Sequence, residues 1–141
     1  LDAGEVARRW RVDTWQFTYN IISQEAAWEL IPVLRELSMG TIVKRPLSNV
    51  VWRFEERPEG DFLGRPWERT REMPLGELAG DLPLTEFALR FVLSHPGVDV
   101  ALVGTISEEH LREDVRYAEK GPLPEEMVRR AKDTFLSMFG T

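Results

Sequence analysis

Three segments of the chain have the hydrophobic pattern of β-strands. In the first, aromatic residues alternate with Gln16 and Thr18, and this period of two predicts a strand over about residues 14–19. The other two segments, 41–43 and 100–103, are short and continuously apolar. That pattern is typical of strands that are buried on both faces.

Hydrophobic residues at helical spacing surround these segments. They predict helices at residues 2–10, 23–37, 86–94, 107–118 and 124–139. Ser23, Thr85 and Ser107 are suited to cap the starts of three of these helices. In the helix over 23–37, Pro32 predicts a kink or a late start, and Gly40 is placed to close the helix.

The pattern dissolves between residues 48 and 83, where prolines and glycines interrupt a charged stretch. We expect an irregular loop excursion there. A loop of this length is usually functional or partly ordered by short helices of its own. A solvated surface loop is one interpretation of residues 53–71, and a lid over a ligand is the other.

Alternation of strands and helices predicts an α/β protein with a parallel sheet. A complete barrel of eight strands takes about 250 residues, whereas this chain has 141 residues and three predicted strands. We therefore expect a partial (β/α) TIM barrel, formed by a single domain over residues 1–141. Since the chain begins with Leu1 rather than methionine, it is expected to be a trimmed product or part of a longer protein.

Composition narrows the possible classes of function. The sequence has no cysteine, which removes disulfides and thiolate chemistry and favours the reducing cytoplasm. Its net charge of −6 argues against a nucleic-acid partner. No apolar run approaches the ~20 residues of a membrane span, and no group of His, Asp and Glu has metal-ligand spacing. We expect no membrane, nucleic-acid or metal partner.

Polar residues follow each predicted strand, at the edge where ligands bind in parallel sheets. The pairs are Tyr19–Asn20, Lys44–Arg45 and Gly104–Thr105. Two cations beside the start of the helix at Ser107 indicate an anion site, with backbone N–H groups directed at a phosphate. The same serine also fits a purely structural N-cap, with Glu108 and Glu109 satisfying the helix dipole.

Two stretches resemble the carboxyl-terminal half of aldo-keto reductases. The first is WQFTYNIISQEAAWELIPVLRELSMGTIVKRPLSN, and the second, more specific, is ALRFVLSHPGVDVALVGTISEEHLREDVRYAEKGPLPEE. Members of that family are eight-stranded barrels that reduce aldehydes and ketones with NADP(H). The resemblance covers nearly the whole chain except residues 48–83, which correspond to a variable loop.

The resemblance implies a cofactor site along the strand ends. Gln16 would hydrogen-bond the nicotinamide carboxamide. Lys44 stands where the family often has an aromatic residue stacked on the nicotinamide ring, so its aliphatic chain and its charge would contact the ring instead. The pyrophosphate and the adenosine would contact the remaining residues of the implied set, which are Arg45, Leu47, Gly104, Thr105, Ser107, His110, Glu113 and Asp114. His110 stands in place of a frequent arginine and Asp114 in place of an asparagine, so NAD(H) stays open beside NADP(H).

The family's catalytic aspartate, tyrosine, lysine and histidine lie on the first strands, and no residue of this chain corresponds to them. A local pair of Tyr19 and Lys44 is an alternative proton donor, although an aromatic residue at a strand end more often packs. Three interpretations follow. In the first, the chain is the carboxyl-terminal half of a reductase and is inactive without an amino-terminal half-barrel. In the second, it is a non-catalytic half-barrel that binds nucleotide or self-associates through its open edges. In the third, it is a structural remnant without a ligand.

Overall fold

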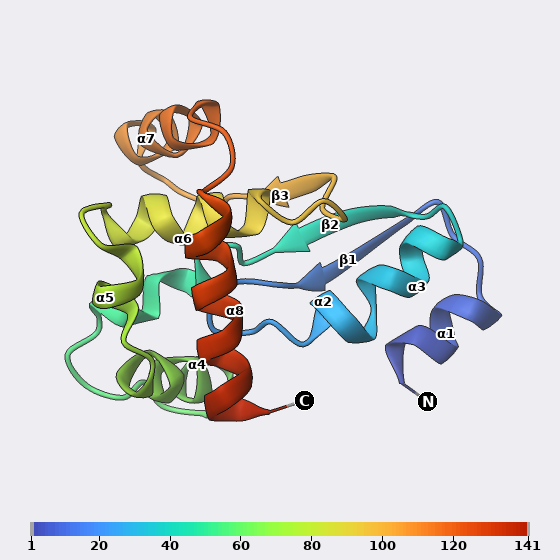
Figure 1. Cartoon of the computed structure of the whole chain (residues 1–141), viewed down its shortest axis with the longest axis horizontal. Coiled ribbons are helices and arrows are strands. Elements are labelled where there is room, and N and C mark those ends of the chain that lie inside the picture. The colour runs from blue at the N-terminus through green and yellow to red at the C-terminus, as the bar shows by residue number, and fades with distance from the viewer. Residues whose placement is uncertain (1, 141) are drawn as a thin grey trace.

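The computed structural model describes residues 2–140 and contains one parallel sheet. Its strands are β1 (Thr14–Thr18), β2 (Gly40–Lys44) and β3 (Val100–Leu102), in the order β1-β2-β3 (Figure 1). The three arrowheads in Figure 1 point the same way. The expected α/β class and partial barrel are confirmed.

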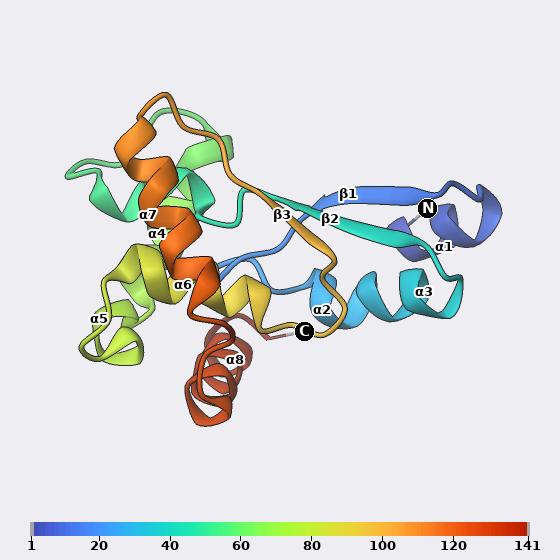
Figure 2. The same ribbon diagram turned by 90° about the horizontal axis from the view of Figure 1, so that it is seen from above.

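Helices cover one face of the sheet and gather beyond the carboxyl ends of its strands. Figure 2 shows α1 (Ala3–Arg9), α2 (Ala26–Glu29) and α3 (Ile31–Glu36) on the same face. The later helical segments are η1 (Ser48–Arg53), α4 (Asp61–Glu72), α5 (Leu75–Ala79), α6 (Leu84–Leu93), α7 (Glu108–Glu119) and α8 (Glu125–Phe139). Within residues 2–140, every helix is too short or too polar to cross a membrane.

The two faces of the sheet differ in burial. Thr41 and Val43 of β2 are fully buried against the helices. On the opposite face Val100 and Leu102 of β3 are each 45% exposed, and no helix lies beside them (Figure 2). The prediction that β3 is buried on both faces is therefore wrong, because the described chain supplies no element to cover its outer side.

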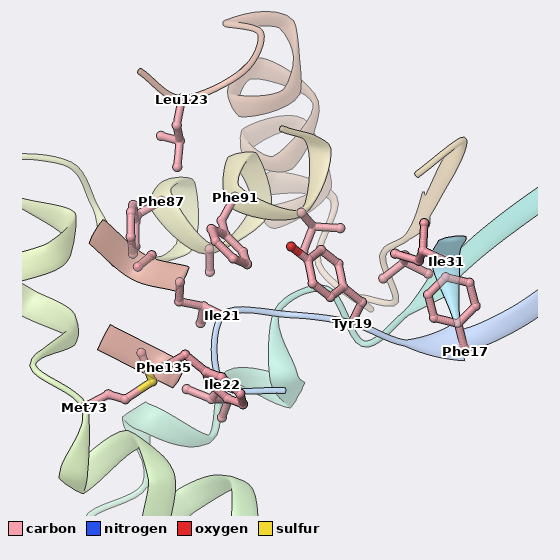
Figure 3. Close-up of a cluster of buried hydrophobic side chains, with 14 of the residues drawn as sticks. Phe17, Tyr19, Ile21, Ile22, Ile31, Met73, Phe87, Phe91, Leu123 and Phe135 are labelled. Carbon is pink, nitrogen blue, oxygen red and sulfur yellow. The ribbon is translucent and has the colours of Figure 1, made fainter. Parts of the chain in front are cut away.

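The hydrophobic core lies between the sheet and α6, beyond the end of β1 (Figure 3). Tyr19 is fully buried, and its ring stacks on Phe91 with centroids 5.7 Å apart. The helix α6 is buried on several sides, as its nearly all-round apolar sequence predicted. Phe135 of α8 closes the core from the carboxyl-terminal end of the chain.

Helix boundaries differ from the prediction at Ser23, Thr85 and Gly40. Ser23 does not cap a helix, because its backbone pairs with Asn20 in a bridge. Thr85 lies inside α6, which begins after Pro83. Gly40 belongs to β2, and α3 ends before Ser38, whose φ is 56°. The interruption expected at Pro32 is confirmed, since Leu30 separates α2 from α3 and the proline lies in the first turn of α3.

Segment 48–83 is more ordered than the sequence predicted. It contains η1, α4 and α5, and α4 has 12 residues. Gly64 and Pro66 hid this helix from sequence-based prediction, because both residues usually interrupt helices. Gly64 fits closely here, since a Cβ at this position would lie 2.5 Å from the guanidinium carbon of Arg57, and Pro66 lies inside the helix. Arg69 fixes α4 to the core, since it donates to the Ile22 carbonyl at 2.9 Å and pairs with Glu25 at 2.8 Å.

A polar latch joins the amino ends of β2 and β3. The Thr41 backbone N–H donates to Asp99 Oδ2 at 2.8 Å, and the Asp99 N–H donates to Thr41 Oγ1 at 2.8 Å. Thr41 Oγ1 also lies 2.7 Å from the Gly97 carbonyl oxygen, to which it donates. Since β3 has only three residues, this latch fixes where β3 starts relative to β2.

A buried carboxylate joins α6 to the loop between α7 and α8. Glu86 is 1% exposed and accepts bonds from Arg90 at 2.8 Å and Lys120 at 2.7 Å. Arg90 also donates to the carbonyls of Gly121 and Pro122. Burial acts to raise the pKa of Glu86, but the bonds from Lys120 and Arg90 outweigh it and hold the pKa below its usual value.

We expect Thr41→Val to lower the free energy of unfolding by about 1–3 kcal/mol, because it leaves the Asp99 N–H and the Gly97 carbonyl without their buried partner. Urea unfolding followed by circular dichroism measures this change. Thr14→Val, on the exposed edge strand, is the matched control and should lie within about 0.5 kcal/mol of the parent. Equal effects of the two substitutions would contradict the latch.

We expect Glu86→Gln to lower the free energy of unfolding by about 3 kcal/mol at pH 7, since it removes a buried charge that two cations share. The folded-state pKa of Glu86 is depressed, so its contribution is present above the unfolded value and is lost as pH falls through the folded value. The difference between parent and variant should therefore shrink in acid. Unfolding midpoints measured from pH 7 to pH 3 test this, and a constant difference would refute it.

Candidate functional site

The register of the sheet brings the carboxyl ends of its strands to one level. Thr18 pairs with Lys44, and Lys44 pairs with Leu102. Beyond β2 and β3 lies a hollow of about 470 Å³. Its lining combines Arg45, Pro46, Leu47, Asn49 and Val50 with Leu102, Val103 and Gly104. Three predicted site residues, Arg45, Leu47 and Gly104, thus line one space.

The backbone after β2 is held from the end of β1. The buried Asn20 donates from Nδ2 to the Arg45 carbonyl at 3.0 Å, and its Oδ1 accepts from the Ile22 N–H at 3.1 Å. Arg45 itself has a φ of 55°, in the left-handed region. Sequence reasoning did not assign Asn20 this role. The signal was its place at a strand end, where an amide can serve both a donor and an acceptor.

The side chain of Arg45 rests on α4. Its guanidinium carbon lies 4.2 Å from the centre of the Phe62 ring, a cation–π contact. Phe62 is 61% exposed and Arg45 is only half-buried, so this pair lies at the surface. The segment considered as a lid or a surface loop therefore supplies a platform for Arg45.

Backbone strain concentrates at the rim of the hollow. Ser48, Asn49 and Val50 have φ values of 47°, 53° and 49°. Each left-handed L-residue costs roughly 1–2 kcal/mol, and a β-branched residue such as Val50 is especially disfavoured there. Such strain persists where the surroundings hold it, and it is often found at binding sites.

The amino terminus of α7 is capped from within. The Ser107 side chain accepts from the His110 N–H at 3.3 Å, as predicted for an N-cap. The Ser107 N–H donates to Thr105 Oγ1 at 3.1 Å. Two of the donors expected to face an anion thus have local partners, and Glu108 and Glu109 add negative charge in the first turn.

Two predicted site residues lie on the uncovered face of the sheet. Gln16 is exposed and Lys44 is half-buried. They occupy adjacent strands, with Gln16 opposite Ile42 and Lys44 two residues further along. Neither side chain belongs to the lining of the 470 Å³ hollow.

The remaining predicted residues lie on α7 and point in different directions. His110 is exposed and Glu113 is half-buried. Asp114 is 6% exposed and lines a gap of about 130 Å³ between β3, α6 and α7. Burial raises the pKa of the Asp114 carboxyl. The structure does not bring Asp114 to the hollow that Arg45 lines.

Tyr19 is part of the core and does not form a proton-donating pair with Lys44. Its side chain is fully buried, and burial strongly raises the pKa of its hydroxyl. His95 packs edge-on against the Tyr19 ring at 5.3 Å. The structural interpretation of Tyr19 is therefore confirmed. Within residues 2–140, His, Asp and Glu form no group of three or more that could hold a metal ion.

The chain matches a family model along most of its length. The model is that of the aldo/keto reductase family, and it covers residues 4–134. Among curated proteins, the chain is 25% identical over 112 residues to the uncharacterized oxidoreductase YqkF of Bacillus subtilis. That match takes in 72% of this chain and 36% of the relative.

Solved structures show the same fold. The aldo-keto reductase AKR11C1 of Bacillus halodurans matches with a TM-score of 0.71 in its apo form and 0.70 in its holo form. Sequence identity is 23%, and 92% of this chain is covered in both comparisons. The chain spans 46% and 45% of those two chains, which is less than half the length of the proteins it matches.

We expect Val50→Gly to raise the free energy of unfolding by about 1 kcal/mol, because glycine removes the left-handed strain at some cost in chain entropy. Thermal unfolding measures the change. Val50→Ala keeps the strain and should give no gain. Val51 is fully buried with an ordinary φ, so Val51→Gly should instead be destabilising. If Val50→Gly lowered the free energy of unfolding as much as Val51→Gly does, backbone strain at Val50 would be refuted.

Proposed function

This chain belongs to the aldo/keto reductase family, and from that premise we propose that it is the carboxyl-terminal, cofactor-cradling half of a carbonyl reductase that uses NADP(H). One observation carries this proposal: the hollow at the carboxyl ends of β2 and β3, which is lined by the cation of Arg45 and by Gly104. Ligands of parallel α/β folds bind at this edge of the sheet.

The lining of the hollow suits a dinucleotide. Arg45 presents a guanidinium on the Phe62 ring, which fits a pyrophosphate because that group needs a positioned cation. A Cβ built on Gly104 would meet nothing within 4 Å, so a ligand can approach the backbone there. We assign the pyrophosphate to Arg45 and Leu47, and the adenosine side to Gly104, Thr105 and Ser107.

The nicotinamide end is assigned to the uncovered face of the sheet. Gln16 is placed to bond the carboxamide, and the stem of Lys44 to contact the ring. When bound, the reduced cofactor supplies a hydride. The residues of this chain position the cofactor, and they include no counterpart of the aspartate, tyrosine, lysine and histidine that the family uses at the carbonyl. We infer that an amino-terminal half-barrel provides those groups and that the isolated chain has no turnover.

NADP(H) is proposed over NAD(H) because the family resemblance implies it, whereas Arg45 is assigned to the pyrophosphate that both cofactors carry. The preference is expected to be modest. Glu108 and Glu109 oppose a 2′-phosphate, and the exposed His110 pairs with phosphate only when protonated. The absence of cysteine fits a reducing compartment, and we place the protein in the cytoplasm.

Open edges favour a second candidate function, a self-associating half-barrel without catalysis. Within residues 2–140, each outer strand of the sheet has a neighbour on one side only, and such edges readily pair with another chain. Beside β3, the α7 side chains Leu111 and Val115 are 47% and 50% exposed. A second copy that covers these residues would bury the edge without an amino-terminal half.

Titration of the purified chain with NADPH tests the cofactor proposal, with its five tryptophans as reporters. We expect a saturable change in tryptophan fluorescence and no aldehyde-dependent loss of absorbance at 340 nm. Arg45→Gln should weaken binding by about 10-fold, since it removes a charge-assisted contact to phosphate. Arg130→Gln, an exposed arginine of α8, should not change it.

Light scattering of the same samples separates the two candidates. Saturable binding by a monomer supports the cofactor half. A discrete dimer that shows no fluorescence change at millimolar NADPH would instead support the self-associating half-barrel and overturn the cofactor proposal.

A further inference from the structure

Lys44 is a cation on the uncovered face of the sheet, at the level where the strands end. It pairs in the register with Thr18 of β1 and Leu102 of β3. Neighbouring residues of a strand point to opposite faces. Lys44 therefore shares its face with Gln16 and Ile42, whereas Thr41 and Val43 face the helices.

The ammonium group of Lys44 has no charge partner among residues 2–140, because the ion pairs of that part of the chain involve other residues. Lys120, in contrast, pairs with Glu86 at 2.7 Å. A half-buried lysine without a carboxylate is available to an anionic partner from outside, which would accept a charge-assisted hydrogen bond from its ammonium group.

The cation of Lys44 is separate from the proposed phosphate cradle. Arg45, the next residue, lines the 470 Å³ hollow, and Lys44 does not. The two consecutive cations thus serve two different spaces. The proposed cofactor phosphates account for Arg45 and leave the charge of Lys44 unassigned.

The surroundings of Lys44 favour a small organic anion. Gln16 and Thr18 add an amide and a hydroxyl on the same face, and both can donate hydrogen bonds. Towards β3 the face is apolar, with Ile42, Val100 and Leu102. Donors on one side and apolar side chains on the other match a carboxylate carried on a short hydrocarbon.

We propose that Lys44 binds a carboxylate of the carbonyl substrate, so that the reductase prefers aldehydes and ketones that bear an acid group. This inference rests on the proposed function. The stem of Lys44 contacts the nicotinamide and its ammonium group reaches the substrate. The residue therefore determines specificity rather than the hydride transfer itself.

The test uses the reductase that contains both halves, with NADPH and two matched aldehydes, 4-oxobutanoate and butanal. The readout is the ratio of kcat/KM for the acid to kcat/KM for the neutral aldehyde. Lys44→Gln should lower this ratio by about 10-fold, mainly through KM for 4-oxobutanoate, because it removes one charge-assisted bond. Lys44→Arg should restore most of the ratio. Lys132→Gln, on α8, is the matched control and should not change it.

The outcomes distinguish this inference from the proposed function. If Lys44→Gln leaves the ratio of the two kcat/KM values unchanged, the inference is overturned. Equal losses of kcat/KM for both aldehydes would instead indicate a contact with the cofactor. A lower unfolding midpoint with an unchanged ratio would indicate an ion pair with the other half of the protein. In both cases turnover of butanal by the parent still supports the reductase. Absence of NADPH oxidation with both aldehydes in the parent would overturn the proposed function itself.

Discussion

The register between three parallel strands is the constraint on which the site depends. It aligns Thr18, Lys44 and Leu102, so that the loops after all three strands leave the sheet at one level. Since side chains alternate along a strand, a slip of one residue would turn Lys44 towards the helices and expose Val43. The bonds between Thr41 and Asp99 hold the register at the opposite end, where β3 is too short to fix it by its own ladder.

A second constraint acts on the loop after β2. Asn20 fixes the carbonyl of Arg45, and Phe62 supports its guanidinium. These contacts come from the segment after β1 and from α4, both distant from Arg45 in sequence. Arg45 would therefore lose little freedom on binding the proposed pyrophosphate, because its backbone and side chain already have fixed partners.

Much of the fold follows from local pattern, and much of the site does not. The alternation of Trp15, Phe17 and Tyr19 predicted β1, and Ser107 capped α7 as expected. The helix α4 was missed because glycine and proline usually interrupt helices, whereas here Gly64 lies against Arg57 and Pro66 lies inside the helix. The contacts that position Arg45 join residues 17 and 25 positions apart, and no periodicity within one element reveals such pairs.

Burial of β3 was misread for a different reason. A continuously apolar strand indicates cover on both faces, but the sequence of one chain does not say whether that cover belongs to the same segment. The chain matches only 46% of the solved relative's length, and we attribute the discrepancy to cover that the proposed amino-terminal half-barrel supplies.

A sheet with its hydrophobic core on one side and exposed side chains on the other suits the amino-terminal half-barrel that we propose as its partner. The core around Tyr19, Phe91 and Phe135 is built from residues of this chain on the helix-covered side of the sheet. Complementation of two separately expressed pieces is therefore a practical way to study assembly of such a barrel. Burial of the exposed face of the sheet would report that the two pieces have joined.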